Sequence, residues 1–440
     1  MSPDAVGGAE ARASSGSGVL RDLQERGLVH DHTDLVALAA RLDEGPTPTY
    51  CGFDPTASSL HIGNLQSIML LRRFQDAGHP PIALVGGATG MIGDPSGRTS
   101  ERQFLDPAVL DVNRAAIDAQ LRQFLDFEGR AAATVVDNRS WTEPVGLLEF
   151  LRDVGKHVTI NTMLAKESVK ARLQRESGIS FTEFSYMLLQ ANDYRVLHDS
   201  NGCDLQVAGS DQWGNITAGI DLVRRSSGDV VHGLTAPLIV RADGTKFGKS
   251  EGENIWLDPG RTSPYRLHQY FMNVADNDVE PLLLRLTTVP VASCREIAGA
   301  HAEAPERRDG QRALARALTT LVHGADAVAP AEEAAGVLFG ELPIIDVSRS
   351  TLELLAGEIP TSALRRDEVT GVDPVDLLAD QRIGLAKSKG EARRNLAGYS
   401  VNQTRLADRD GRHIAGADLL ADGYLLLSRG RRSHHLIRVE

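Results

Sequence analysis

The chain of 440 residues is long enough for two or three domains, and its apolar content of 42% is that of an ordinary globular protein. It has no apolar run of about 18 residues and no secretory signal, so we expect a cytoplasmic protein. The net charge of −12 argues against a nucleic-acid-binding surface over the whole chain, and three widely separated cysteines argue against a disulfide framework or a CxxC zinc site.

Residues 371–440 differ from this average. They carry 12 Lys and Arg against 9 Asp and Glu, a local balance of 12 − 9 = +3. A basic, nucleic-acid-binding module at the end of an acidic protein therefore stays open.

Residues 1–18 are rich in Ala, Gly and Ser and contain too few apolar residues to fold, so we predict a disordered tail. Residues 19–42 predict two short helices, the second capped by Asp31 or Thr33.

Residues 49–53 predict a strand, and a Pro/Ser turn then leads into a helix with periodic apolar residues from Leu65 to Phe74. A second apolar strand follows at 82–85. Strand, helix and strand in this order open a parallel α/β sheet, which binds ligands at the carboxyl ends of its strands.

His61, Gly63 and Asn64 lie at such an end, on the first turn of the helix. Free backbone N–H groups there favour a phosphate, and Gly63 lets a nucleotide base approach the backbone. Taken alone, these letters also fit a helix start with an incidental histidine.

The sequence GGATGMIGDPSGRTS follows the second strand and matches neither the dinucleotide nor the P-loop motif, which disfavours a P-loop NTPase. Asp94 in this loop should face the same crevice as His61. Arg98 and Arg102 either reach a polyphosphate or are surface arginines.

A helix that begins near Ser180 carries Tyr186, Gln190 and Asp193 at positions i, i+4 and i+7. A phenol, an amide and a carboxylate thus share one face, which is either a ligand site or a solvated surface.

A buried strand, 205–208, ends at Gly209 and is followed by Asp211 and Gln212, again polar residues at a carboxyl end. We predict a further strand at 238–240. The glycine-rich loop after it carries Lys246 and Lys249, which suits either a mobile lid over a phosphate or a solvated basic turn.

Ser263 and Pro264 open a largely helical region that continues to about residue 340. The pattern then weakens, which predicts a linker. The last seventy residues combine a short helix from Ser388 with short strands at 399–401, 424–427 and 436–439, typical of a small RNA-binding unit.

Five segments, YCGFDPTASSLHIGN, GDPSGRTSER, FTEFSYMLLQANDY, GSDQWGNITAG and ADGTKFGKS, together resemble the bacterial tyrosyl-tRNA synthetases, a class I aminoacyl-tRNA synthetase family. The resemblance runs from about residue 19 to 440. It implies a Rossmann-like parallel-sheet catalytic domain, an α-helical domain and a small α/β RNA-binding domain. The implied division is a tail at 1–18, the catalytic domain at 19–258, the helical anticodon-side domain at 259–345, a linker at 346–370 and the RNA-binding domain at 371–440.

The resemblance also implies roles for individual residues. Catalysis would involve His61, Asn64, Lys246, Lys249 and Ser250. Tyrosine would be bound by Tyr50, Asp94, Tyr186, Gln190, Asp193, Gln206 and Gln212. ATP would be bound by Gly52, Asp54, His61, Gly63, Asn64, Gly209, Asp211, Lys246 and Lys249, and RNA by Lys387, Lys389, Arg393 and Arg394.

The implied reaction joins L-tyrosine to ATP, which arrives with Mg²⁺, and then transfers tyrosine to tRNA(Tyr). A homodimer is implied, and no protein-bound metal. Three residues in two motifs depart from the family pattern. Asn64 replaces the second histidine of the family's HIGH motif, and Phe247 and Gly248 replace the Met and Ser of its KMSKS motif. The alternatives are a paralogue that makes an amino-acid adenylate for another purpose, a tryptophan-specific enzyme, and an RNA-binding scaffold without activity.

Overall fold

The computed structural model describes residues 18–94, 105–164, 166, 169–170, 173, 178–240, 247–250, 253–409, 411–421, 423–430 and 433–440, with the side chains of 249 and 250 excepted. Its chain contacts divide it into two compact units. The first unit comprises Met1–Arg261 and Val274–Leu314, and the second comprises Thr262–Asn273 and Ala315–Glu440. Lys246, Arg98 and Arg102 lie outside the described residues.

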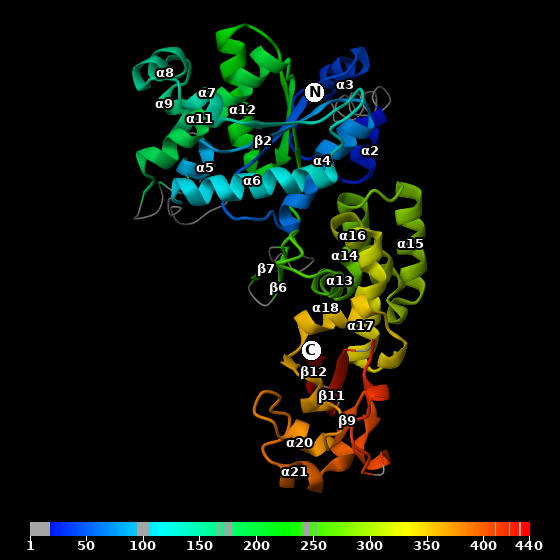
Figure 1. Cartoon of the computed structure of the whole chain (residues 1–440). Helices are drawn as coiled ribbons and strands as arrows, with labels where there is room; N and C mark the ends of the chain where they lie inside the picture. Colours follow the sequence, from blue (N-terminus) through cyan, green and yellow to red (C-terminus); the bar gives the residue numbers. More distant parts are fainter. Residues whose placement is uncertain are drawn as a thin grey trace. The chain divides into compact units, whose positions relative to one another are not determined.

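The first unit is built on a parallel five-stranded sheet, which confirms the predicted fold class (Figure 1). Its strands are β1 (Thr49–Phe53), β2 (Pro81–Val85), β3 (Thr134–Asp137), β4 (Leu205–Gly209) and β5 (His232–Ala236), in the spatial order β3-β2-β1-β4-β5. From β1 the chain builds outward through β2 and β3, and then returns to β4 and β5 on the other side. Right-handed crossovers therefore place the helices that follow β1 and β4 on opposite faces of the sheet.

Helices surround this sheet (Figure 1). They are α2 (Gly18–Glu25), α3 (Leu35–Glu44), α4 (Ile62–Asp76), α5 (Thr89–Ile92), α6 (Pro107–Phe124), α7 (Arg139–Thr142), α8 (Leu147–Asp153), α9 (Ile160–Leu164), α11 (Phe181–Asn201) and α12 (Trp213–Ser226). The same unit includes α14 (Asp276–Leu286), α15 (Val291–Glu303) and the first residues of α16 (Asp309–His323). Leu65, Ile68 and Phe74, three of the predicted apolar positions of α4, are buried.

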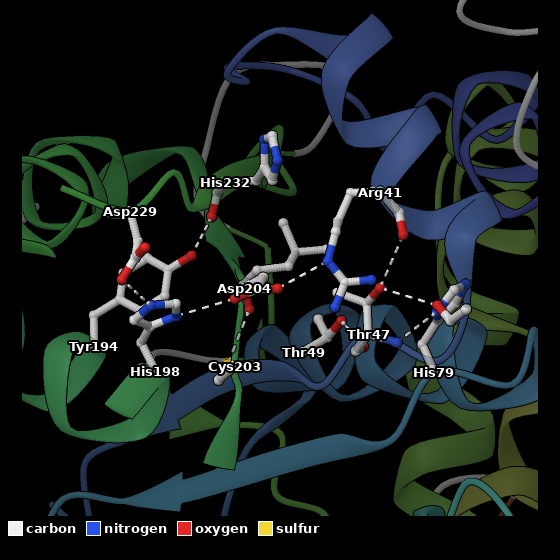
Figure 2. A network of polar contacts seen from close by, with 12 residues as sticks. Arg41, Thr47, Thr49, His79, Tyr194, His198, Cys203, Asp204, Asp229 and His232 are labelled. Atoms are coloured by element: carbon white, nitrogen blue, oxygen red, sulfur yellow. Dashed lines mark hydrogen bonds and ion pairs between the residues drawn. The ribbon is translucent and has the colours of Figure 1, made fainter. Parts of the chain in front are cut away.

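A polar network closes the amino ends of the central strands (Figure 2). Asp204, just before β4, accepts a hydrogen bond from Arg41 at 2.8 Å and contacts His198 at 3.0 Å. The other ring nitrogen of His198 lies 3.3 Å from Asp229. Because His198 sits on the last turn of α11, the network fixes the end of that helix at the edge opposite the strands' carboxyl ends.

The second unit holds a five-stranded sheet of order β10-β9-β11-β12-β8, covered by short helices. Its strands are β8 (Thr361–Leu364), β9 (Tyr399–Val401), β10 (Thr404–Arg405), β11 (Tyr424–Arg429) and β12 (Ser433–Val439), and all pairs are antiparallel except β12 with β8. Its helices are α13 (Pro264–Met272), α17 (Val328–Phe339), α18 (Arg349–Glu358), α19 (Arg366–Val369), α20 (Pro374–Leu378) and α21 (Lys389–Arg394). The three strands predicted in the last seventy residues are therefore present.

Three sequence expectations differ from the structure. Asp34 rather than Asp31 or Thr33 caps α3, because its carboxylate accepts the N–H groups of residues 36 and 37. The strand predicted at 238–240 is found earlier in the chain, as β5. This strand is fully buried, but its polar residues His232 and Thr235 break the apolar pattern expected of a buried strand. Residues 346–370, predicted to be a linker, contain α18 and β8, and β8 completes the second sheet by pairing with β12.

The predicted helical segment 259–345 contains α13 to α17, but these helices are shared between the two units. Within the described part of the chain, no helix combines the length and apolar character needed to cross a membrane.

Candidate active site

The reversal of strand order falls between β1 and β4, which is where an open α/β sheet leaves a crevice for ligands. At their carboxyl ends, β1 leads into Asp54 and β4 into the polar residues 210–212. In the sheet Tyr50 is the direct neighbour of Gln206. Two segments that lie about 150 residues apart in sequence thus meet at one site.

The start of α4 has a defined capping geometry. His61 is the N-cap residue, and its Nδ1 accepts the backbone N–H of Gly63 at 3.1 Å. Its own backbone N–H donates to Oδ1 of Asn64 at 3.1 Å. The neutral imidazole therefore carries its proton on Nε2, where it can serve as a donor. A Cβ on Gly63 would lie 2.9 Å from Cε1 of the imidazole, so a larger residue here would displace the ring from this contact.

The geometry at Asn64 shows how an amide can stand where the family has a histidine. Its side-chain oxygen is used in the cap, and its amide nitrogen still offers two donor hydrogens. The positive end of the helix dipole is at the same place.

Tyr50 and Asp193 form the deep end of the crevice. Tyr50 is 1% exposed, and its hydroxyl has no hydrogen-bond partner among the described residues. Asp193 is 2% exposed and accepts hydrogen bonds from Asn138 at 3.0 Å and from Trp141 at 2.8 Å. Burial raises the pKa of Asp193 to about 7, because desolvation outweighs these two donors. The negative charge of Asp193 is one of the causes that raise the pKa of Tyr50, after burial.

Tyr186 is surrounded by negative charge. Its hydroxyl donates to Asp54 at 2.9 Å, and burial together with Asp54, Asp94 and Asp193 raises its pKa well above the usual value. Thr89 donates to the other oxygen of Asp54 at 2.9 Å. A site with three carboxylates around one phenol favours a cationic group such as an ammonium.

Gln212, which follows β4, connects the end of that strand to this pocket. Its amide donates to Asp94 at 2.6 Å and its oxygen faces the amides of Asn215 at 3.1 Å and Gln190 at 3.4 Å. The side-chain oxygens of Gln190 and Gln206 are buried and have no partner among the described residues. Buried amide oxygens of this kind are expected to accept a hydrogen bond from a ligand.

The residues predicted at the nucleotide side lie along the same strand ends. Gly209 ends β4, and a Cβ there would lie 2.9 Å from Oδ1 of Asp211. Gly52 is the exposed position of β1. Asp54, predicted for ATP, contacts Tyr186 and Thr89 and so lies on the phenol side as well.

The lysine loop is described only in part. Lys249 and Ser250 form β6 (Lys249–Ser250), which pairs with β7 (Glu253–Asn254). The backbone N–H of Ile255 donates to Gly248 at 2.9 Å, and that of Ile62 donates to Ile255 at 2.8 Å. The backbone of the loop is therefore attached to the start of α4.

Thr89, Asn138 and Trp141 also belong to the site, and the sequence patterns did not predict them. Asn138 donates both to Thr89 at 3.0 Å and to Asp193. Because Thr89 also contacts Asp54, Asn138 links Asp193 to Asp54. The available signal was position, because Asn138 and Trp141 directly follow β3, at the same edge of the sheet as the other polar residues.

Comparisons with known proteins agree with this geometry. A family model described as "tRNA synthetases class I (W and Y)" matches residues 42–340. The chain belongs to this family. The resemblance seen in the sequence motifs is thereby confirmed.

The synthetase is similar to curated relatives over nearly its whole length. It is 51% identical over 423 residues to the tyrosine–tRNA ligase of Anaeromyxobacter dehalogenans strain 2CP-1, covering 96% of this chain and 99% of the relative. It is 50% identical over 429 residues to that of Opitutus terrae, with the same coverage. A C-terminally truncated mitochondrial tyrosyl-tRNA synthetase of Aspergillus nidulans has a similar structure, with a TM-score of 0.67 and 33% identity over 73% of this chain and 94% of that one.

The basic residues predicted for RNA lie around α21 of the synthetase. Lys387, Lys389, Arg393 and Arg394 are all exposed. Lys389 contacts Asp376 at 2.9 Å and Arg393 contacts Asp373 at 3.9 Å, and both carboxylates lie on or beside α20. The four cations share a small surface, and part of their charge is offset.

Proposed function

We propose that the synthetase is a tyrosine–tRNA ligase. It forms tyrosyl-adenylate and pyrophosphate from L-tyrosine and ATP, and then transfers tyrosine to the terminal ribose of tRNA(Tyr). The observation that carries the proposal concerns Tyr50 and Asp193. The buried hydroxyl of Tyr50 has no hydrogen-bond partner among the described residues, and it lies beside the buried carboxylate of Asp193. A substrate phenol would donate to Asp193 and accept from Tyr50, which satisfies both groups at once. Relatives that are about 50% identical to this chain over nearly their whole length are named tyrosine–tRNA ligases, which supports this proposal.

The remaining polar groups fit the other end of tyrosine. Tyr186, Gln190 and Asp94 would hold its ammonium group within the negative cluster. Gln206, next to Tyr50 in the sheet, would support the pocket, and Gln212 would face the reacting carboxylate. Phenylalanine would leave Tyr50 and Asp193 without a hydrogen-bond partner. Tyrosyl-tRNA synthetases are the known example of an enzyme that rejects phenylalanine in this way.

The proposed chemistry needs no general base, because the tyrosine carboxylate is ionised at neutral pH. It attacks the α-phosphate of ATP, and the rate comes from alignment and charge stabilisation. His61 through Nε2–H, Asn64 through its amide, and Lys246 and Lys249 would stabilise the phosphate charge, with Ser250 beside them. Gly52, Gly63, Gly209 and Asp211 would bind the adenosine, and Mg²⁺ would enter with the nucleotide.

The second unit would bind tRNA through Lys387, Lys389, Arg393 and Arg394. Their exposure on a short helix beside a small sheet suits contacts with phosphates, which position RNA without reading bases. With ATP and tRNA as substrates, the proposed place of action is the cytoplasm.

We also propose a homodimer, from an apolar surface on α8, α9 and the start of α11. Leu147, Leu148, Ile160 and Phe181 expose 71%, 81%, 59% and 78% of their surface. Residues of these three helices, Phe150, Met163 and Met187 among them, pack in one shared core, and Figure 1 shows the three helices close together. An apolar surface of this kind is typical of a protein–protein contact.

The test is to charge total tRNA with labelled tyrosine beside tyrosine-dependent ATP–pyrophosphate exchange. We expect both reactions with tyrosine and neither with phenylalanine or tryptophan. Exchange without charging would instead indicate an adenylate-making paralogue, and loss of both with retained RNA binding would indicate a scaffold.

A further inference from the structure

Trp256 directly follows β7 and contacts the start of α4. It forms an isolated antiparallel bridge with His61. The indole and imidazole centroids lie 6.1 Å apart, with the ring planes at 61°, which is an edge-to-face contact. A ring that meets the imidazole from the side limits the rotation of the His61 side chain.

The backbone on both sides of Trp256 is fixed. Ile62 donates to Ile255 at 2.8 Å, and Leu257 donates to Leu60 at 2.9 Å. Residues 255–257 therefore run along residues 60–62 as a short antiparallel ladder. A Cβ on Gly248 would lie 2.7 Å from Ile62, so the lysine loop also approaches this ladder closely.

Arg261 holds the indole from a second direction. Its guanidinium carbon lies 3.4 Å from the centroid of the Trp256 ring, well inside the range of a cation–π contact. A planar guanidinium that stacks on an indole restricts the orientation of that ring more than a flexible ammonium does. The turn from Asp258 to Arg261, closed by a backbone hydrogen bond of 3.0 Å, brings the arginine back to the tryptophan.

His61 is thus confined from two sides. The N–H of Gly63 holds Nδ1, and Trp256 contacts the ring edge to face. We propose that Trp256 and Arg261 are positioning residues, which orient the imidazole of His61 so that Nε2–H is directed at the phosphate. This inference rests on the proposed role of His61 in adenylate formation. Neither Trp256 nor Arg261 needs to touch the substrate.

The test measures tyrosine-dependent ATP–pyrophosphate exchange with Trp256→Leu, Arg261→Gln and Arg261→Lys. We expect Trp256→Leu to lower kcat about tenfold, the order of effect that a small misalignment produces, with KM for tyrosine unchanged. Arg261→Gln should lower kcat about threefold, and Arg261→Lys should restore only part of it, because an ammonium keeps the cation–π attraction but not the stacking of the planar guanidinium. Arg224→Gln, an exposed arginine on α12, is the matched control and should leave kcat unchanged.

A double-mutant cycle with His61→Asn separates positioning from general stability. If Trp256 acts through His61, Trp256→Leu should cost little further activity in the His61→Asn background. Equal losses in both backgrounds, or no loss from Trp256→Leu, would overturn the inference while leaving the proposed role of His61 intact. Full activity of His61→Asn would instead refute the role of His61 and this inference with it. Melting temperatures of all variants identify any that fail to fold.

Discussion

The indole N–H of Trp141 lies 2.8 Å from Oδ1 of Asp193, at the closed end of the crevice. Trp141 lies in α7 and Asp193 in α11, and only the fold brings these two helices together. The contact helps to hold a carboxylate that burial has made difficult to ionise. The pKa of about 7 puts the charge of this residue within the working pH range.

The first prediction concerns this pKa. In the proposed complex the ionised carboxylate accepts the substrate hydroxyl, so KM for tyrosine should rise as the pH falls below about 7, by up to about tenfold per unit. Exchange kinetics between pH 6 and 8 measure this. Asp193→Asn has no carboxyl to titrate and should show weak but pH-independent binding. A wild-type KM that stays constant over this range would contradict the assignment.

The same group affects stability in a defined direction. Its folded pKa lies above the usual value of 3.8, so between about pH 4 and 7 the folded state binds more protons than the unfolded state. The contribution of Asp193 to the free energy of unfolding therefore falls as the pH rises through this window.

The second prediction separates stability from binding at Tyr50. Tyr50→Phe removes a buried hydroxyl that has no hydrogen-bond partner in the part of the chain that the structure describes, so the melting temperature of the free protein should stay the same or rise. KM for tyrosine should increase about fivefold to tenfold, because one hydrogen bond to the substrate is lost. Calorimetry and exchange kinetics give the two values. A large fall in melting temperature with unchanged KM would show that the hydroxyl is structural.

The third prediction tests the close approach at Gly86. A Cβ at this position would lie 2.2 Å from Oδ1 of Asp54 and 2.3 Å from Oγ1 of Thr89. Gly86→Ala should therefore displace both side chains and lower kcat/KM for tyrosine about a hundredfold. Gly146→Ala is the control, because a Cβ there would meet no atom of the described residues within 4 Å. Equal activity of the two variants would show that Asp54 and Thr89 do not need this arrangement.

The fourth prediction concerns the lysine loop. Lys249→Ala should slow adenylate formation about a hundredfold and change tyrosine affinity little, as expected for an interaction made mainly in the transition state. Single-turnover adenylate formation and equilibrium tyrosine binding provide the comparison. Lys156→Ala, an exposed lysine outside the site, should change neither. Similar losses in rate and affinity for Lys249→Ala would argue against a transition-state role.

The fifth prediction tests the apolar surface. Leu148→Asp places a charge where 81% of a leucine is exposed, and should shift the protein from dimer to monomer in sedimentation. Val230→Asp, an apolar residue that is 75% exposed elsewhere, should leave the assembly unchanged. A Leu148→Asp variant with wild-type mass would place the contact on another surface.

The sequence by itself determined the local elements and the identity of most polar groups. The strand at 49–53, the start of α4 at His61 and the polar face of α11 are visible because their signals lie within one turn or one strand. The matching motifs, taken together, indicated the family before any contact was known.

Only the tertiary structure decided which polar groups meet. Asn138 and Trp141 reach Asp193 across more than fifty residues, and Tyr50 meets Gln206 because β1 and β4 are neighbours. The same holds for β8, which lacks a strong strand pattern and forms because it pairs with β12. Local periodicity encodes helices and strands, whereas strand order and burial, which set these contacts and the pKa of Asp193, arise only when the whole chain packs.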